Sequence, residues 1–452
     1  MKHVDISKIV FVLTFTVVLF VCGMVVGAYQ SSARAVLDYF IENLALIYHE
    51  RTNLAQTRPE HFLQPARYDG DGVTVNTVAE DEKSFLFLLG FFKDTNELRL
   101  IARDGSLVAR WPVRYSEIFT DVSHLERPPV THWNTETHGA LILPDGSIVF
   151  NFEYAGLVKL DRCGRVLWTL PLRTHHSVEH AEGGGFWVGN RRHVLPDGPS
   201  PFPPFEPPYD EDSILKVSED GAVLAELSVP KIFFDNGLGA ILTASGRSFR
   251  TGMSWDREIL HLNKVEELTS DIADDFPLFE AGDLALSIRD LNMVLVIDPR
   301  DGNVKWWHIG PWLRQHDPEF IAGGKILVFN NNTFETAFGS SDGSKSDLSI
   351  PRVSNIIEMD PVSLDYDIVY GGSPDQALLS VWRGKVEATP TGGLLVTEFE
   401  GGRVFETDAA GNIIWEYVNR FDRDEVAEIT EARLYPASYF TVSDWSCDGQ
   451  PN

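Results

Sequence analysis

From Leu98 onward, one pattern of apolar and polar positions returns along the chain. An apolar run, a turn usually containing Asp and Gly, and a second apolar run occur six times, as LRLIARDGSLVARW, LVKLDRCGRVLW, ILKVSEDGAVLAEL, VLVIDPRDGNVKWW, IIEMDPVSLDYDIVY and RVFETDAAGNIIWEY. Turn formers between apolar runs indicate β-hairpins. Successive copies lie roughly 50 to 80 residues apart, a period typical of four-stranded propeller blades.

A second kind of hairpin precedes five of these copies. Its sequences are ALILPDGSIVF, VEHAEGGGFWV, LFEAGDLALSI, EFIAGGKILVF and EATPTGGLLVTEF. Two hairpins make one four-stranded blade, and blades arranged in a ring bury their faces against one another and leave only short edges. A pair of β-sandwiches is the alternative, but six units in one phase favour a ring. We therefore expect an all-β, six-bladed β-propeller.

Two insertions interrupt the rhythm of the hairpins, and little else has helical spacing. Residues 195–212 include PDGPSPFPPFEPPYDE, whose prolines cannot donate to a sheet, so we expect a loop across one face of the ring. Residues 330–349 are rich in Gly, Ser and Asn and predict a second loop. Both loops are candidates for a lid.

The N-terminal region has a different pattern. Residues 9–28, IVFVLTFTVVLFVCGMVVGA, carry no charge, and about twenty residues at ~1.5 Å each span a hydrocarbon core of roughly 30 Å. A cleavable signal peptide is the alternative, but this run exceeds the usual ~7–15 apolar residues of such peptides. We therefore expect a transmembrane helix. Residues 35–54 show helical apolar spacing with polar interruptions, which predicts an amphipathic stalk helix.

These features predict three parts: a cytoplasmic tip and transmembrane anchor at 1–30, a stalk helix and linker at 31–68, and the propeller at 69–452. Lys2 and Lys8 precede the apolar span, whereas the first cation after it is Arg34. Positive charge favours the cytoplasmic side. The sequence therefore predicts a single-pass membrane protein whose body lies on the periplasmic or extracellular side.

Charge and cysteine content narrow the function further. The 66 acidic residues outnumber the 38 basic ones, the net charge is −28, and cations do not cluster, so nucleic acid is excluded as a partner. An acidic surface repels anions at long range, so an anion site has to be local and made of a few focused donors. Outside the apolar span, only Cys163 and Cys447 remain. They allow at most one disulfide, whose formation the sequence leaves open, and no zinc site.

Histidine recurs at one position of the repeat. His138, His176 and His316 each stand eight residues before a turn glycine, so we expect all three at the same mouth of the central channel. His261 opens the equivalent strand of the intervening blade, and Arg289 ends that hairpin. Imidazoles with a guanidinium suit a trigonal or tetrahedral oxyanion, because Arg offers a planar donor fork and His can donate, accept or attack.

Two other interpretations of the histidines carry less weight. A metal site from the same residues is less favoured, because no His-x-His or His-x-x-x-His pair with carboxylate support occurs among them, and we expect no metal or other cofactor. The remaining histidines outside this phase are expected to be surface or packing residues. They are His124, His132, His180, His193 and His308.

Four segments resemble the bacterial arylsulfate sulfotransferases, which are six-bladed propellers of the periplasm. They are ILHLNKVEEL, DLALSIRDLNMVLVIDP, WLRQHDPEFIAGGKILVFNN and GGLLVTEFEGGRVFETDAAGNIIWEY, and the resemblance covers roughly residues 130 to 420. It implies transfer of a sulfuryl group from a phenolic sulfate ester to a phenolic acceptor, through a sulfohistidine and without a nucleotide sulfate. It also implies that His316 is the nucleophile, that His261 and Arg289 hold the sulfate oxygens, and that His176 assists with the oxygens or the phenolic proton.

The chain departs from that family in two respects. Characterised soluble members carry an extra N-terminal β-domain and a close cysteine pair near the nucleophile, whereas this chain has an apolar span and no such pair. A non-catalytic propeller that scaffolds a membrane complex, or assembles with copies of itself, is the alternative, because a ring of repeats offers large binding faces. A quinone-dependent dehydrogenase, suggested by DPRDGNVKWW, is less favoured, because six units and no acidic metal cluster are predicted.

Overall fold

The computed structural model describes residues 14–21, 23–24, 40–41, 44, 47–48, 51–79, 83–195, 201–202, 205, 207–244, 258–332 and 353–447. The chain divides into two compact units, and the unit that begins at Phe62 contains all the described strands.

In the other unit, the described residues of segments 14–24 and 40–48 are helical, as is α3 (Arg51–Leu54). Within the described ranges, no helix combines the length and the apolar character that crossing a membrane requires. Parts of the predicted span 9–28 and of the predicted stalk 35–54 lie outside the described residues.

The unit that begins at Phe62 is a six-bladed β-propeller, as the repeated hairpins predict. Each blade is an antiparallel sheet, and the innermost strands of neighbouring blades contact one another around the axis. In four consecutive blades, the order of the strands across the sheet is their order in the chain. They are β6 (Thr137–Ile142), β7 (Ile148–Phe152), β8 (Gly156–Leu160) and β9 (Val166–Leu170); β10 (Thr174–His180), β11 (Phe186–Val194), β12 (Tyr209–Val217) and β13 (Val223–Ser228); β14 (Leu262–Glu267), β15 (Leu284–Ile288), β16 (Met293–Ile297) and β17 (Val304–Ile309); and β18 (His316–Ile321), β19 (Lys325–Asn330), β20 (Asn355–Met359) and β21 (Tyr366–Tyr370).

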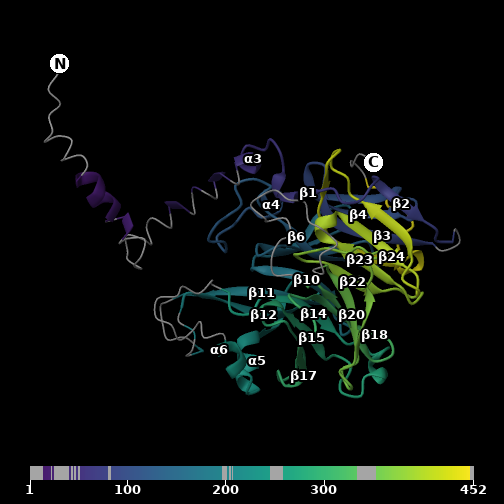
Figure 1. The fold of residues 1–452 in the computed structure, drawn as a ribbon. Helices are drawn as coiled ribbons and strands as arrows, with labels where there is room; N and C mark the ends of the chain where they lie inside the picture. Colours follow the sequence, from purple (N-terminus) through teal and green to yellow (C-terminus); the bar gives the residue numbers. More distant parts are fainter. Residues whose placement is uncertain are drawn as a thin grey trace. The chain divides into compact units, whose positions relative to one another are not determined.

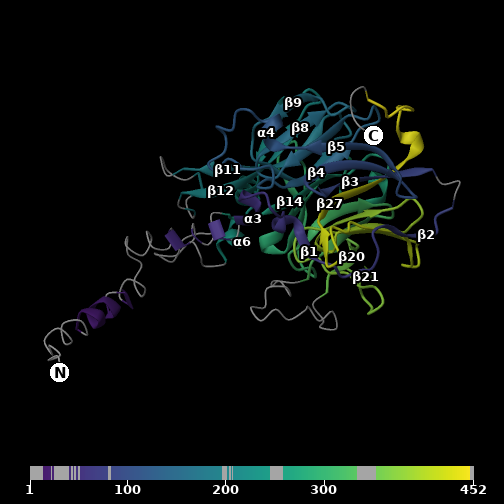
Figure 2. The same cartoon turned by 90° about the horizontal axis from the view of Figure 1, so that it is seen from above.

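The remaining two blades join the two ends of the propeller. In one, β27 (Ile429–Pro436) is the inner strand beside β3 (Ser84–Phe92), β4 (Thr95–Ala102) and β5 (Leu107–Val113). Figure 1 and Figure 2 show the yellow C-terminal chain beside the blue strands of that blade. In the other, β2 (Gly72–Asn76) adds a fifth strand outside β22 (Lys385–Ala388), β23 (Leu394–Glu398), β24 (Arg403–Thr407) and β25 (Ile413–Val418). The ring is therefore closed twice, and a short pair, β1 (Leu63–Pro65) with β26 (Glu425–Ala427), adds a third contact.

The core of the propeller is divided among the spaces between neighbouring blades. In β16, Met293, Leu295 and Ile297 pack into one apolar cluster, whereas Val294 and Val296 pack into the cluster on the opposite face. Successive side chains of a strand point to opposite faces, so a blade between two others needs apolar residues at every position. This requirement explains why the central strands are continuous apolar runs instead of alternating ones.

Helices are few and short in the described part of the propeller, as the hairpin pattern predicts. Ser228 caps α5 by accepting a hydrogen bond from the Lys231 amide at 3.2 Å, and Pro230 lies in the first turn. The α-helices are α4 (Tyr115–Ile118), α5 (Val229–Asp235) and α6 (Gly239–Thr243), and the 3-10 turns are η1 (Glu60–Phe62), η3 (Ala273–Asp275), η4 (Arg289–Leu291), η5 (Phe399–Gly401) and η6 (Ala437–Tyr439).

The two predicted insertions are only partly described. Residues 196–200, 203–204 and 206 of the first and residues 333–349 of the second lie outside the described residues. The end of the first differs from the prediction, since Tyr209 already belongs to β12 and pairs with Val194 of β11. The proline-rich connection is therefore shorter than the sequence pattern suggests.

Cys163 and Cys447 form a disulfide, which the sequence left open. Cys163 lies in the turn between β8 and β9, and Cys447 follows β27. Nearby, the Arg162 guanidinium donates to the Asp444 carbonyl at 2.7 Å, and the Trp445 ring packs edge-on against Trp111. The bond ties the C-terminal segment to the blade that begins with β6.

Candidate active site

Four inner strands lose their regular register at their first residues. The shifts lie between Thr137 and Ala140 in β6, His175 and Val178 in β10, Leu262 and Lys264 in β14, and His316 and Glu319 in β18. Such bulges bend a strand and redirect its side chains. His176 and His261 also have left-handed φ angles of +56° and +60°, a conformation that costs energy for residues with a side chain and is common at functional sites.

Neighbouring inner strands approach each other closely at these bulges. Gly139, with φ +78°, faces the backbone of His176 in the next blade. A Cβ atom at position 139 would lie 1.7 Å from the His176 carbonyl oxygen, so only glycine fits there. The close approach brings the rings of His138 and His176 together.

The structure brings the four predicted histidines into one cluster with His176 at its centre. The His176 ring centroid lies 4.6 Å from that of His138, 5.0 Å from that of His261 and 6.3 Å from that of His316. All four residues are buried. The shared position in the repeat is thus a shared position in space, as the phase predicts.

His316 is held by an asparagine from the end of the next strand. The Asn331 side-chain amide donates to the carbonyls of Ser380 and Arg383, both at 2.7 Å, so its oxygen is left to accept. That Oδ1 lies 2.7 Å from His316 Nδ1, and the Arg314 carbonyl oxygen lies 3.2 Å from the same nitrogen. Two acceptors at Nδ1 require that this nitrogen carries the hydrogen, so the electron pair is on Nε2.

Arg289 lies beside the cluster, as predicted. It begins η4, directly after β15, and its backbone N–H donates to the His261 carbonyl at 3.0 Å. Its Nε donates to Asp290 at 2.9 Å, and its terminal nitrogen lies 3.9 Å from Glu258. Because β14 and β15 form a hairpin, the end of the second strand lies next to the start of the first, which places Arg289 and His261 at the same mouth.

Three further residues extend the cluster away from His316. His175 Nδ1 lies 2.8 Å from His176 Nδ1, and His176 Nε2 lies 3.3 Å from His261 Nε2. Glu258 is in close contact with His261 Nδ1, and Asp212 Oδ1 lies 3.6 Å from His175 Nε2. The phase of the repeat points to His176 alone, whereas in the structure the His175 ring also contacts the His176 ring and belongs to the cluster.

Burial and nearby cations keep the imidazoles neutral. Burial, with Arg289 adding to it, lowers the pKa of His316 to about 3 and the pKa of His261 well below its usual value. Burial and the neighbouring imidazoles likewise lower the pKa of His176, and burial with Arg191 lowers the pKa of His175. Neutral rings with free electron pairs are suited to nucleophilic attack and to proton transfer.

Among the residues that the structure describes, one group has ligand atoms close enough to hold a metal ion. The ligand atoms of His138, Glu153 and His176 lie within 4.8 Å of one another. Glu153 supplies the carboxylate that the sequence pattern lacks, but it also forms an ion pair with Arg383. A carboxylate whose charge is already balanced by a guanidinium is a weak metal ligand, and the absence of a metal stays a prediction.

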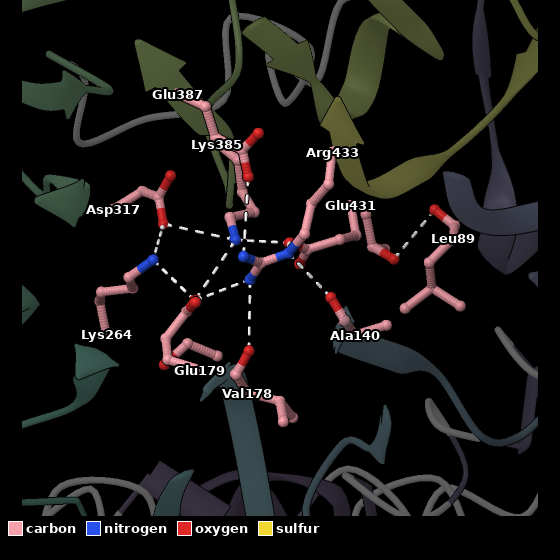
Figure 3. A network of polar contacts seen from close by, with 12 residues as sticks. Leu89, Ala140, Val178, Glu179, Lys264, Asp317, Lys385, Glu387, Glu431 and Arg433 are labelled. Carbon is pink, nitrogen blue, oxygen red and sulfur yellow. Dashed lines mark hydrogen bonds and ion pairs between the residues drawn. The ribbon is translucent and has the colours of Figure 1, made fainter. Parts of the chain in front are cut away.

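Farther along the same inner strands, charged side chains fill the axis of the ring (Figure 3). Lys264 lies 2.7 Å from Glu179 and 3.0 Å from Asp317, and Arg433 also pairs with Glu179 at 2.8 Å. Asp317 follows the candidate nucleophile and also accepts the Val386 amide hydrogen at 2.8 Å. This network therefore anchors the strand that carries His316.

Carboxylates outnumber cations in this network. Burial raises the pKa of Glu266 and of Glu387 to about 7, because a low-dielectric interior disfavours the charged form. The excess negative charge is thus reduced by bound protons. The other members of the network are Glu319, Lys385 and Glu431.

Comparison with known proteins adds a family. Residues 139–420 match the family described as arylsulfotransferase (ASST). No curated protein sequence matches the chain. A similar solved structure is a protein of unknown function from Bacteroides caccae, with 14% identity and a TM-score of 0.43; the match covers 74% of this chain and 93% of that one. Virginiamycin B lyase from Staphylococcus aureus has 12% identity and a TM-score of 0.39, and the match covers 82% of this chain and 97% of the lyase. TolB from Acinetobacter baumannii has 10% identity and a TM-score of 0.40, and the match covers 78% of this chain and 66% of TolB. At these values the likenesses carry no argument about function.

Proposed function

Because the chain belongs to the arylsulfotransferase family, we propose that it transfers a sulfuryl group from a phenolic sulfate ester to a phenol, with His316 as the nucleophile. Membership of the family implies arylsulfate sulfotransferase activity and aryl sulfate substrates. The histidine intermediate and the roles of single residues are the proposal.

The proposed reaction has two half-reactions at one nitrogen. His316 Nε2 attacks sulfur, the bond from sulfur to the aryl oxygen breaks, and the phenol leaves after taking up a proton. The acceptor phenol then loses a proton, its oxygen attacks the sulfur of the sulfohistidine, and the nitrogen–sulfur bond breaks. Splitting one difficult transfer into two easier ones is the usual advantage of covalent catalysis.

The contact between His316 and Asn331 is the observation that carries this proposal. Asn331 is oriented by two backbone carbonyls, so its oxygen keeps the hydrogen of His316 on Nδ1. The attacking nitrogen is then Nε2, and the ring does not rotate away from it. A low pKa of about 3, caused mainly by burial, keeps that nitrogen free of a proton at neutral pH.

The surroundings of His316 supply what the transferred group needs. Arg289 offers a donor fork for the equatorial oxygens, whose charge is shared in the transition state, and His261 and His176 add neutral ring nitrogens. Arg314 accepts the His316 hydrogen through its carbonyl, and its guanidinium lies 5.3 Å from the ring centroid of Trp382. Trp382 is 45% exposed, and we propose that its ring contacts the aryl group of the substrate.

Trapping the intermediate tests the proposal directly. Mixing the protein with an aryl sulfate in the absence of acceptor is expected to add the mass of one sulfuryl group to the peptide that contains His316. Adding a phenol is expected to remove it, because the acceptor completes the second half-reaction. Measurement is by mass spectrometry of peptides prepared at neutral or alkaline pH. Modification of a different histidine under these conditions would refute the assignment.

We further propose that the N-terminal apolar segment anchors the protein in a membrane and that the propeller lies outside the cytoplasm. The uncharged run at 9–28, with Lys2 and Lys8 before it, supports this orientation. The disulfide between Cys163 and Cys447 supports it too, since such bonds persist in oxidising compartments and are rare in the cytosol. A membrane partner or self-association stays a prediction from the sequence.

The disulfide gives a test of this location. Protein taken from membranes of the producing cells with thiols blocked is expected to yield a linked Cys163–Cys447 peptide. Its reduction is expected to lower the free energy of unfolding by about 2–4 kcal/mol, because the bond restricts the unfolded chain. Chemical denaturation with and without reductant measures the difference, and Cys163→Ser serves as the control that reductant leaves unchanged. Free thiols at both positions in freshly isolated protein would contradict an extracytoplasmic body.

A further inference from the structure

Five side chains beside the nucleophile form one continuous chain of contacts. In order, they are Glu258, His261, His176, His175 and Asp212. The two contacts between imidazoles join nitrogen to nitrogen, at 3.3 Å and 2.8 Å. Both ring nitrogens of His176 are engaged, one on each side.

The number of hydrogens in this chain is constrained by its chemistry. Each of its four contacts joins two atoms that accept hydrogen bonds, so each needs one hydrogen between them. Three neutral imidazoles carry three hydrogens. The four contacts are therefore all occupied only when a fourth hydrogen is present, and this hydrogen has to come from one of the two carboxyl groups at the ends of the series.

The distances show which end lacks the fourth hydrogen. His261 Nδ1 and Glu258 are in close contact, as expected with a hydrogen between them. At the opposite end, His175 Nε2 lies 3.6 Å from Asp212 Oδ1, so that contact is the more open of the two, although the end nitrogens His175 Nε2 and His261 Nδ1 are both buried and neither forms a hydrogen bond of regular geometry. Two acceptors that face each other without a hydrogen stay apart, so the vacant proton position is between His175 and Asp212.

We propose that Asp212 stores the proton that leaves and re-enters the phenolic oxygen during transfer, and that His175 and His176 relay it. This inference rests on the proposed function. As the bond from sulfur to the aryl oxygen breaks, His176 Nε2 gives its proton to that oxygen. His175 then passes its Nδ1 proton to His176, and the Asp212 carboxyl passes its proton to His175 Nε2. The acceptor phenol reverses each step and returns the proton to Asp212.

The environment of Asp212 is suited to this exchange. Burial, with Glu258 adding to it, raises the pKa of Asp212 to about 6, although Arg191 and the Leu262 amide oppose the shift. Arg191 Nε lies 3.4 Å from Asp212 Oδ1, and the Leu262 N–H donates to Oδ2 at 3.3 Å. A carboxyl group with such a pKa exchanges its proton near neutral pH, where a general acid and base is most effective.

The groups around His175 disfavour storage of the proton on the His175 ring. Burial and the Arg191 guanidinium lower the pKa of His175 well below its usual value, so an imidazolium is unstable there. The Tyr154 ring packs against His175 with centroids 4.8 Å apart, and burial raises the pKa of Tyr154 well above its usual value, which keeps the phenol neutral. His175 is therefore suited to pass a proton on and unsuited to keep it.

Asp212→Asn tests the relay, because asparagine preserves the shape and cannot release a proton. With a donor whose phenol is weakly acidic, kcat/KM is expected to fall about 10²-fold, since the leaving oxygen needs the proton. With a nitrophenyl sulfate, whose phenolate leaves unaided, the fall is expected to stay within about threefold. Asp210→Asn is the matched control: Asp210 lies two residues earlier on β12 and pairs with Arg173 at 3.0 Å, and both donors are expected to react as in the wild type.

Equal losses with the two donors in Asp212→Asn would overturn the relay, because a purely structural role does not depend on the leaving group. A second measurement does not need turnover. Infrared titration of the intact protein is expected to show a carboxyl band that appears as the pH falls through the Asp212 pKa of about 6 and that is missing from Asp212→Asn. Titration without sulfuryl transfer would refute the proposed function alone, and transfer without this titration would refute the relay alone.

Discussion

Replacing His316 by alanine is expected to lower kcat for sulfuryl transfer by at least about 10⁴-fold, the scale seen when a covalent nucleophile is removed. The reason is specific to this ring. Its Nδ1 hydrogen is directed to Asn331 at 2.7 Å, which leaves Nε2 as an attacking nitrogen in a fixed direction. The imidazoles of His175, His176 and His261 contact one another through ring nitrogens, and His176 uses both of its nitrogens in that way.

Turnover with a chromogenic aryl sulfate and a phenol measures this loss. His308→Ala is the matched control, because His308 lies on β17, stacks on Trp306 and has no place in the cluster. Added imidazole is expected to restore part of the activity of His316→Ala, since it can occupy the vacated space and accept the sulfuryl group. Thermal unfolding shows whether the variant is folded. Turnover by a folded variant at the wild-type rate would exclude His316 as the nucleophile.

Replacing Arg289 by methionine is expected to lower kcat by about 10²–10³-fold, the usual effect of removing one preorganised donor of an oxyanion site. Arg289 is held at the cluster by its backbone bond to His261 and by Asp290. Its planar fork matches two oxygens of a trigonal sulfuryl group at once. Arg289→Lys keeps the charge and loses the fork, so it is expected to recover only part of the activity.

Separate values of kcat and KM decide what Arg289 does. If the guanidinium stabilises charge that develops during transfer, kcat falls; if it only attracts the donor ester, KM rises and kcat is unchanged. Arg300→Met is the control, because Arg300 lies on the same blade, pairs with Asp298 and is 72% exposed. A rise in KM with an unchanged kcat would show that Arg289 binds the substrate and does not stabilise the transition state.

The blades were predictable from the sequence because each hairpin is local. Apolar runs joined by turns rich in Asp and Gly carry their own register, and the six outer hairpins are found where the pattern places them. The closure of the ring was not predictable in this way. The pairing of β27 with β3, and of β2 with β25, joins segments from opposite ends of the chain, and no turn between them leaves a signal.

The candidate site divides in the same manner. The shared position of the histidines in the repeat predicts that they lie at one mouth of the channel, because equivalent residues of neighbouring blades lie at equivalent places around the ring. Asn331 and Asp212 were missed, since each contacts its histidine from another strand, and Glu258 was missed although it lies only three residues before His261. One signal was present for Asn331: an asparagine run follows an apolar strand directly, where a polar side chain at the mouth would be expected. No comparable signal marks His175, whose direction depends on a bulge.

The double closure of the ring also determines when, during synthesis, the propeller can complete its folding. β3, with the sequence SFLFLLGFF, is almost entirely apolar, and one of its edges is covered only by β27, near the C-terminal end of the chain. During synthesis that edge remains unpaired until the last strand has been made, and an open apolar edge is what chaperones and proteases recognise. A chain that lacks β27 therefore keeps this apolar edge exposed to chaperones and proteases. For the location outside the cytoplasm that we propose, the same arrangement would help export, because the ring cannot close before its final strand has been made.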